Sequence, residues 1–163
     1  MYRNDLYLQS KIPTRYQAVH WWPTPNTQFS LPDVVPVEVQ NPFDEGCRCA
    51  AVSAPNAAVA MFRNAIAAIV QIKGSDEANS KNTLFLTIQQ MGTDGTLFND
   101  FTEWAHHVRL TGNAGAHQEQ FEDVTSEQAS DLREFTRQLI EFLFVQPARR
   151  KNAMPTTRRA VES

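Results

Sequence analysis

Apolar residues recur three and four positions apart along most of the chain after residue 43, and this spacing predicts amphipathic helices. The segment 56–73 should be the central helix, because it carries two apolar stripes and would be buried on most sides. Pro55 starts it and Gly74 ends it. The first stripe consists of Val59, Phe62, Ile66 and Ile69, and the second of Met61, Ala65, Ala68 and Ile72.

Further helices are expected on both sides of this segment. A short helix should begin near Asp44, with its acidic residues at the favourable N-terminal end. Ser80 could cap a helix that Gly92 ends, and Gly95 with Thr96 would start the next one. Their predicted core positions are Leu84, Phe85, Ile88 and Met91, followed by Leu97, Phe98, Phe101, Trp104, Ala105, Val108 and Leu110.

The last helix has the clearest start signal. Thr125 and Gln128 match a capping box, in which each side chain accepts from a free backbone N–H of the other residue. Pro147 should stop this helix, because proline lacks an N–H and its ring clashes with the preceding turn. The predicted core face is Ala129, Leu132, Phe135, Leu139, Phe142 and Leu143.

Residues 1–43 are predicted to form an extended N-terminal arm, because six of the nine prolines fall there. We expect Trp21 and Trp22 to pin this arm onto the helices rather than to bind a ligand. Val34, Val35, Val37 and Val39 could form a short extended segment, which Pro36 would confine to an edge. The helical bundle would then span residues 44–147, and residues 148–163 would be a flexible basic tail.

Composition and charge narrow the function. A chain of 163 residues that is 42% hydrophobic fits one domain with one core and excludes wholesale disorder. We expect a cytoplasmic protein without a membrane segment, since no apolar run nears the ~20 residues that span a bilayer. Residues after Pro147 carry +4 of a total charge of −3, which leaves −7 for the body. An acidic body repels phosphates, so nucleic-acid binding would need the tail or a local pocket.

Cys47 and Cys49 are the only cysteines, and they lie one residue apart. Such close neighbours rarely form a disulfide, and two thiols alone cannot complete a tetrahedral zinc site. We expect plain reduced thiols near the start of a helix. The alternative is a zinc pair that His20 or another chain completes.

One stretch of the chain carries candidate chemistry. Arg109, Asn113 and His117 are four residues apart and would share one face of a continuing helix. A guanidinium, a carboxamide and an imidazole on one stripe could hold a phosphate and move a proton. The alternative is that these residues only cap and hydrogen-bond an irregular junction, because Gly112 and Gly115 weaken the helix.

These residues also carry a family resemblance. The pattern Arg109-x-x-Gly112-Asn113-x-x-Ala116-His117, followed by a capped helix ending at residues 144–148, resembles the bacterial family called domain of unknown function 4145. The alanine-rich helix around residues 57–63, with Arg63, and the Trp-Pro-x-Pro arm before it are similar to that family as well. The resemblance covers roughly residues 20–150.

The resemblance implies membership of the HEPN superfamily, whose small all-helical domains commonly dimerise and whose active members are metal-independent ribonucleases. The fold expected is therefore an all-α, HEPN-like bundle of four to five helices, with an extended arm and a homodimeric state. In a ribonuclease, His117 would act as general base or acid while Arg109 stabilised the phosphorane and Asn113 oriented the phosphate. We expect no cofactor and no metal.

The match to the catalytic pattern has one departure. Counted back from His117, the usual arginine position holds Gly112, and the nearest arginine is Arg109, one helical turn earlier. This displacement and the acidic body favour a non-catalytic HEPN-like module that binds a partner protein. It would belong to a bacterial phage-defence or nucleic-acid-related system. The alternative is a metal-independent ribonuclease that cleaves RNA with Arg109, Asn113 and His117.

Overall fold

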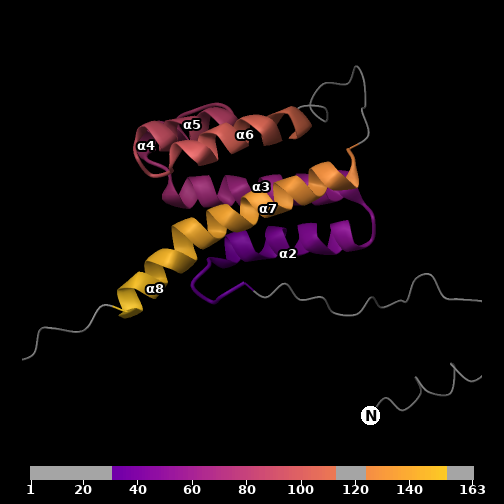
Figure 1. Ribbon diagram of the computed structural model, residues 1–163, viewed down its shortest axis with the longest axis horizontal. Coiled ribbons are helices and arrows are strands. Elements are labelled where there is room, and N and C mark those ends of the chain that lie inside the picture. Colours follow the sequence, from indigo (N-terminus) through magenta and orange to yellow (C-terminus); the bar gives the residue numbers. More distant parts are fainter. Residues whose placement is uncertain (1–30, 113–123, 154–163) are drawn as a thin grey trace, which may run out of the picture.

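A computed structural model describes residues 31–112 and 124–153 of the protein, and only the backbone of residues 108–112. These described residues form helices and contain no strand, which confirms the all-α class for this part of the chain (Figure 1). No helix within them is both long and apolar enough to cross a membrane. The elements are α2 (Val37–Ala51), α3 (Pro55–Lys73), α4 (Asp76–Asn79), α5 (Leu84–Thr93), α6 (Asn99–Gly112), α7 (Ser126–Ile140), the π-helical turn η1 (Glu141–Val145) and α8 (Gln146–Ala153).

Helix α3 lies at the centre of the bundle, as its apolar stripes predicted. It packs against α2 on one side and against α5 on the other, and α7 runs across it (Figure 1). The first predicted stripe is confirmed, because its four residues are all 5% exposed or less. The second stripe is only partly confirmed: Ala65 is buried, but Ile72 is 44% exposed. With 100° per residue, Ile72 lies at the edge of the buried face of α3, whose centre is occupied by Phe62 and Ile66.

Helix α2 begins earlier than predicted. It starts at Val37 rather than near Asp44, so residues 37–43 are neither an extended arm nor an edge segment. Pro36 is its N-cap residue and Pro42 lies inside the helix. The reason is burial: Val39, Phe43 and Cys47 are four apart and form one apolar stripe against the core. Packing of this stripe outweighs the single backbone hydrogen bond that Pro42 cannot donate.

Helices α2 and α3 approach closely at Gly46. A Cβ on Gly46 would lie 2.6 Å from Cε1 of Phe62, which is fully buried on α3. The Phe62 ring is held from another direction by Phe43, with ring centroids 5.7 Å apart. Glycine is therefore required here by space, and the contact fixes how α2 and α3 meet.

The link between α3 and α5 contains α4, a short helix that was not predicted from the sequence. Ser75 caps α4 by accepting from the N–H of Ala78, and Ser80, the predicted cap of the next helix, ends α4 instead. Thr83 caps α5 by accepting from the N–H of Leu86 at 3.2 Å. Gly92 does not end α5, which continues to Thr93.

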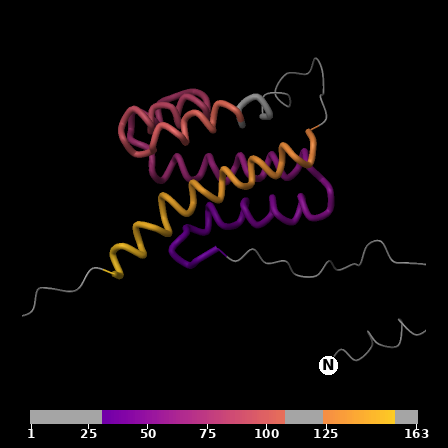
Figure 2. The backbone as a smooth tube through the Cα atoms, in the orientation of Figure 1, coloured from indigo at the N-terminus to yellow at the C-terminus, as the bar shows by residue number. Residues whose placement is uncertain are grey.

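The capping box at the start of α7 is confirmed: Thr125 accepts from the Gln128 N–H, and Gln128 Oε1 accepts from the Thr125 N–H. The predicted stop at Pro147 is wrong, because α8 carries the chain on to Ala153. Figure 2 shows α7, η1 and α8 as one continuous rod. In η1 the Gln146 N–H bonds to the carbonyl of Glu141, five residues back. This wider turn accommodates the Pro147 ring without a break.

Residues 148–153, the first part of the predicted tail, are thus helical. Residues 1–30, with Trp21 and Trp22, and residues 154–163 lie outside the described ranges.

Candidate functional site

Helix α6 carries the first of the three predicted site residues. Its backbone is helical through Arg109 to Gly112, so Arg109 lies on its last turn. The Arg109 side chain is not described, and Asn113 and His117 lie outside the described residues. The structure therefore does not bring the three predicted residues together or separate them.

A groove lies between α5 and α6, on the turns of α6 that precede Arg109. Its volume is about 580 Å3. The two helices touch at one end of it, where a Cβ on Gly92 would lie 2.4 Å from Cγ2 of Thr102. The lining residues are Phe85, Gln89, Gly92 and Thr93 from α5, and Asn99, Thr102, Glu103, His106 and His107 from α6.

The polar side chains in this groove are accessible. Gln89, Asn99, Glu103, His106 and His107 are all exposed. Asn99 donates through Nδ2 to Oε1 of Glu103 at 3.1 Å, which fixes the carboxylate along the groove. The groove therefore offers hydrogen-bond donors and acceptors from neighbouring turns of one helix.

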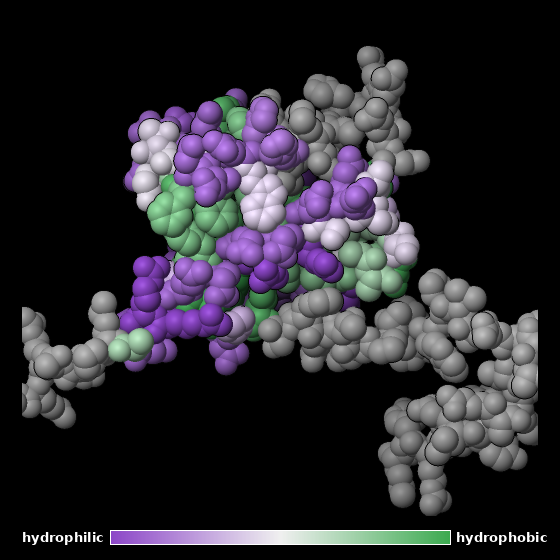
Figure 3. Space-filling model, in the orientation of Figure 1, coloured by the Kyte–Doolittle hydropathy of each residue, from purple (hydrophilic) through white to green (hydrophobic). Residues whose placement is uncertain are grey.

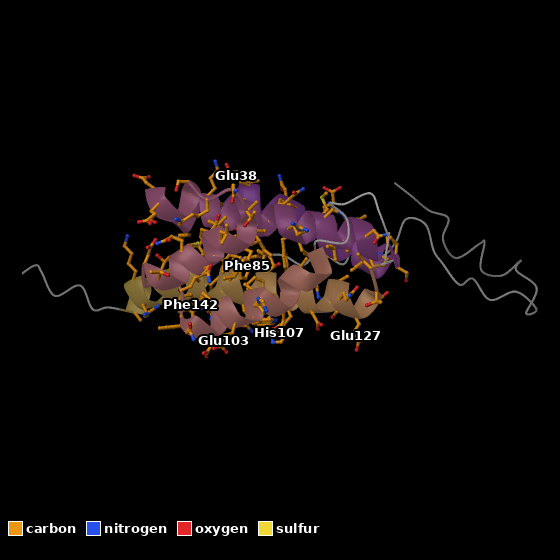
Figure 4. The ribbon with its side chains drawn as sticks, turned by 90° about the horizontal axis from the view of Figure 1, so that it is seen from above. Glu38, Phe85, Glu103, His107, Glu127 and Phe142 are labelled. Carbon is orange, nitrogen blue, oxygen red and sulfur yellow. The ribbon has the colours of Figure 1, made fainter. Side chains whose placement is uncertain are left out.

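An aromatic contact forms the apolar part of the groove. The rings of Phe85 and His106 have centroids 5.9 Å apart, and the His107 ring follows at 6.5 Å from that of His106. Figure 4 shows Glu103 and His107 on the side of the molecule away from Glu38, which lies on α2. A mixed apolar and polar lining of this kind suits recognition of a ligand with both characters.

All formal charges within residues 82–108 are negative. Between residues 82 and 108 the chain contains Asp94, Asp100 and Glu103, and no Lys or Arg. Asp94 accepts from Ser75 at 2.5 Å and from Gln90 at 2.7 Å, and these hydrogen bonds lower its pKa. The α5–α6 layer is therefore acidic up to Arg109.

Cys47 and Cys49 are both free thiols. Cys47 is 2% exposed in the stripe of α2 that packs on the core, and burial raises its pKa to about 11. Both residues lie in the second half of α2, not near its start as predicted. His20 is outside the described residues, and within these residues no cluster of three His, Cys, Asp or Glu could hold a metal.

The groove was not predicted from the sequence. His106 and His107 were noted only as the start of the stretch that ends at His117, and no role was predicted for them. The available signal was the pairing of residues 85, 89 and 92 on α5 with residues 99, 102, 103 and 106 on α6, which share helical faces at spacings of three and four. Finding it would have required knowing that these two faces lie side by side.

Three comparisons with known proteins test the family that the sequence resembles. Neither the curated proteins nor the solved structures gave a significant match. A family model, described as a domain of unknown function, matches residues 44–157, which is more than half of the chain. The chain therefore belongs to the family of domain of unknown function DUF4145.

Proposed function

We propose that this chain is a non-catalytic, HEPN-like interaction module that binds a partner protein through the groove between α5 and α6. The groove is the observation that carries the proposal. It combines an aromatic contact, Phe85 with His106, with exposed amide, carboxylate and imidazole groups on one helix. A peptide segment presents apolar and hydrogen-bonding groups at comparable spacing, so it can satisfy both parts of such a lining.

Electrostatics favours a protein partner over a nucleic acid at this groove. Glu103 lines it, Asp100 lies on the same helix, and no Lys or Arg occurs from residue 82 to 108. A phosphate backbone brought along these turns would meet the carboxylates of Asp100 and Glu103 and be repelled by them. A segment with basic or neutral polar side chains would not be repelled.

The wider setting follows from the family resemblance. HEPN-like domains commonly pair, and we propose that two copies of this chain form a homodimer. We further propose that the dimer works in a bacterial phage-defence or nucleic-acid-related system, where the module would recruit a partner protein rather than cut RNA itself.

Site-directed photocrosslinking tests the groove. A photoreactive amino acid at Gln89 would be compared in cells with the same amino acid at Glu38, which is also exposed but lies on α2 (Figure 4). We expect a discrete crosslinked protein from position 89 and none from position 38. Glu103→Lys should then weaken binding of that purified protein. Equal crosslinking from both positions, or none from position 89, would refute the proposal.

A metal-independent ribonuclease remains the second candidate function. One observation favours this function: α6 is helical from Arg109 to Gly112. The predicted stripe of Arg109, Asn113 and His117 requires a helix over these residues. Purified chain incubated with varied single-stranded RNAs and a chelator would then release products with a 2′,3′-cyclic phosphate. His117→Ala should abolish this cleavage without changing the melting temperature. Such a result would replace the interaction module with the enzyme.

A further inference from the structure

An aromatic patch lies where the start of α6 meets η1. We define it as Phe98, Phe101 and Phe142. Phe98 is 65% exposed, the highest value among the exposed large hydrophobic residues of the described ranges. Its ring contacts Phe142 with centroids 4.9 Å apart, and Phe101 supports Phe142 from behind at 5.4 Å. The exposed ring is therefore held in place from behind.

The two sides of this patch carry opposite charges. On one side the first turn of α6 holds Asp100, which is exposed. On the other side the chain runs from Phe142 directly into α8, which has no buried residue and carries Arg149, Arg150 and Lys151. One of these, Arg149, is already paired with Glu141 at 2.8 Å. Figure 3 shows apolar surface on this face with hydrophilic surface above and below it.

This arrangement is self-complementary. A twofold interface brings one surface against a second copy of itself, so every group must find its partner on the same patch. We place the twofold axis through the aromatic patch, at right angles to the line that joins α6 to α8. The acidic flank of each copy then faces the basic flank of the other copy. The exposed Phe98 rings then meet at the centre, where aromatic anchors contribute most to binding.

We propose that the aromatic patch and its two charged flanks are the surface through which two copies of this chain pair, with α8 of each copy against α6 of the other. The inference rests on the homodimer proposed above and names its interface. A stable pair buries roughly 800 Å2 on each partner, which a single ring cannot supply. Both helical flanks must therefore take part, and the basic α8, none of whose residues is fully buried, gains a role.

Single-stranded nucleic acid is the other occupant that an exposed ring beside a basic helix could suggest, because bases stack on aromatic rings. The acidic flank disfavours it. A strand that reached Phe98 from α8 would continue towards Asp100, whose carboxylate repels phosphates. A second copy uses both flanks, whereas a nucleic acid uses only one.

Sedimentation equilibrium of the full chain tests the proposal by a charge exchange. We expect wild type to dimerise, and Phe98→Ser to weaken dimerisation by about tenfold or more. Asp100→Lys and Arg150→Glu should each weaken the dimer. Either change places like charges opposite each other in both symmetry-related contacts of the dimer. An equimolar mixture of Asp100→Lys and Arg150→Glu should dimerise again, because both contacts are then between opposite charges. Val37→Ser, at a 57% exposed valine on α2, is the matched control and should leave the dimer unchanged.

The possible failures are distinguishable. A wild type that is monomeric throughout would overturn both the proposed homodimer and its interface. A dimer that none of these variants weakens, or a mixture that stays monomeric, would overturn the interface alone. A monomer that binds a fluorescent oligouridine, and loses that binding in Phe98→Ser and Arg150→Glu, would assign the surface to nucleic acid instead. Thermal melts of each variant show whether lost pairing reflects lost folding.

Discussion

Gly46→Ala tests the close approach between α2 and α3. Two effects of this change oppose each other. Alanine is the better helix former, which favours the variant by up to about 1 kcal/mol. The added Cβ would lie 2.6 and 2.7 Å from Cε1 and Cδ1 of Phe62, far inside ordinary carbon–carbon contact. Relief requires the ring to move by about 1 Å to reach the usual 3.5–4.0 Å separation.

The Phe62 ring has little room for that movement. It is 0% exposed, and Phe43, itself 3% exposed, packs against it. Overpacking of a filled core costs about 1–3 kcal/mol, which exceeds the gain in helix propensity. We therefore expect Gly46→Ala to lower the free energy of unfolding by about 1–2 kcal/mol, measured by urea denaturation followed by circular dichroism.

Two further variants isolate the cause. Glu45→Ala introduces alanine at the neighbouring exposed position of α2 and should change stability by less than about 0.5 kcal/mol. In the double variant Gly46→Ala with Phe62→Leu, the smaller side chain makes room for the methyl group, so the double loss should be less than the sum of the single losses. A Gly46→Ala variant as stable as wild type, or strictly additive losses, would show that Phe62 does not limit the space at Gly46.

Three other predictions follow from named contacts. Thr125→Ala should cost about 1 kcal/mol of unfolding free energy through loss of the capping box, while the exposed neighbour Ser126→Ala should cost little, as thermal melts would show. The hydrogen bond from Arg137, supported by one from Gln138, lowers the pKa of Glu134 to about 2. The Glu134–Arg137 pair therefore stabilises the fold above the ordinary pKa of 4.5, and this contribution is lost as the pH falls through 2. Arg137→Gln should therefore destabilise near neutral pH by less than about 1 kcal/mol, because both side chains are half exposed, and the difference in melting temperature from wild type should vanish near pH 2. Burial raises the pKa of Cys47 to about 11, so a disulfide reagent should modify Cys49 first and reach Cys47 fully only on unfolding; equal rates in the folded protein would contradict the burial of Cys47.

The most regular helices could be predicted from sequence alone. Helix α3 has a sustained apolar face and α7 has a capping box, and both signals are local. The first half of α2, residues 37–43, was missed because its prolines were given more weight than the spacing of Val39, Phe43 and Cys47. That spacing is visible in the sequence, but the stripe stabilises a helix only when α3 is present to bury it. The start of α5 was predicted three residues too early, at Ser80 instead of Thr83, because serine and threonine are both favoured N-cap residues.

The candidate site was less predictable than the fold. Arg109, Asn113 and His117 were selected because one helix would align them, and the structure describes that helix only as far as Gly112. The groove and the aromatic patch depend on how α6 lies against α5 and against η1. No pattern within α6 alone specifies those neighbours. Phe98 illustrates the difference, because its apolar character predicted burial and yet its ring is 65% exposed.

The π-helical turn η1 is equivalent to one residue inserted into an otherwise regular helix. Every side chain after such an insertion is rotated by about 100° around the helix axis, relative to an uninterrupted α-helix. The direction in which α8 presents Arg149, Arg150 and Lys151 is thus set by the length of the segment between Leu139 and Pro147. Deleting one residue there should straighten the turn and point these charges to another side of the bundle. In family members, the length of this segment is therefore expected to indicate which face carries the basic charges.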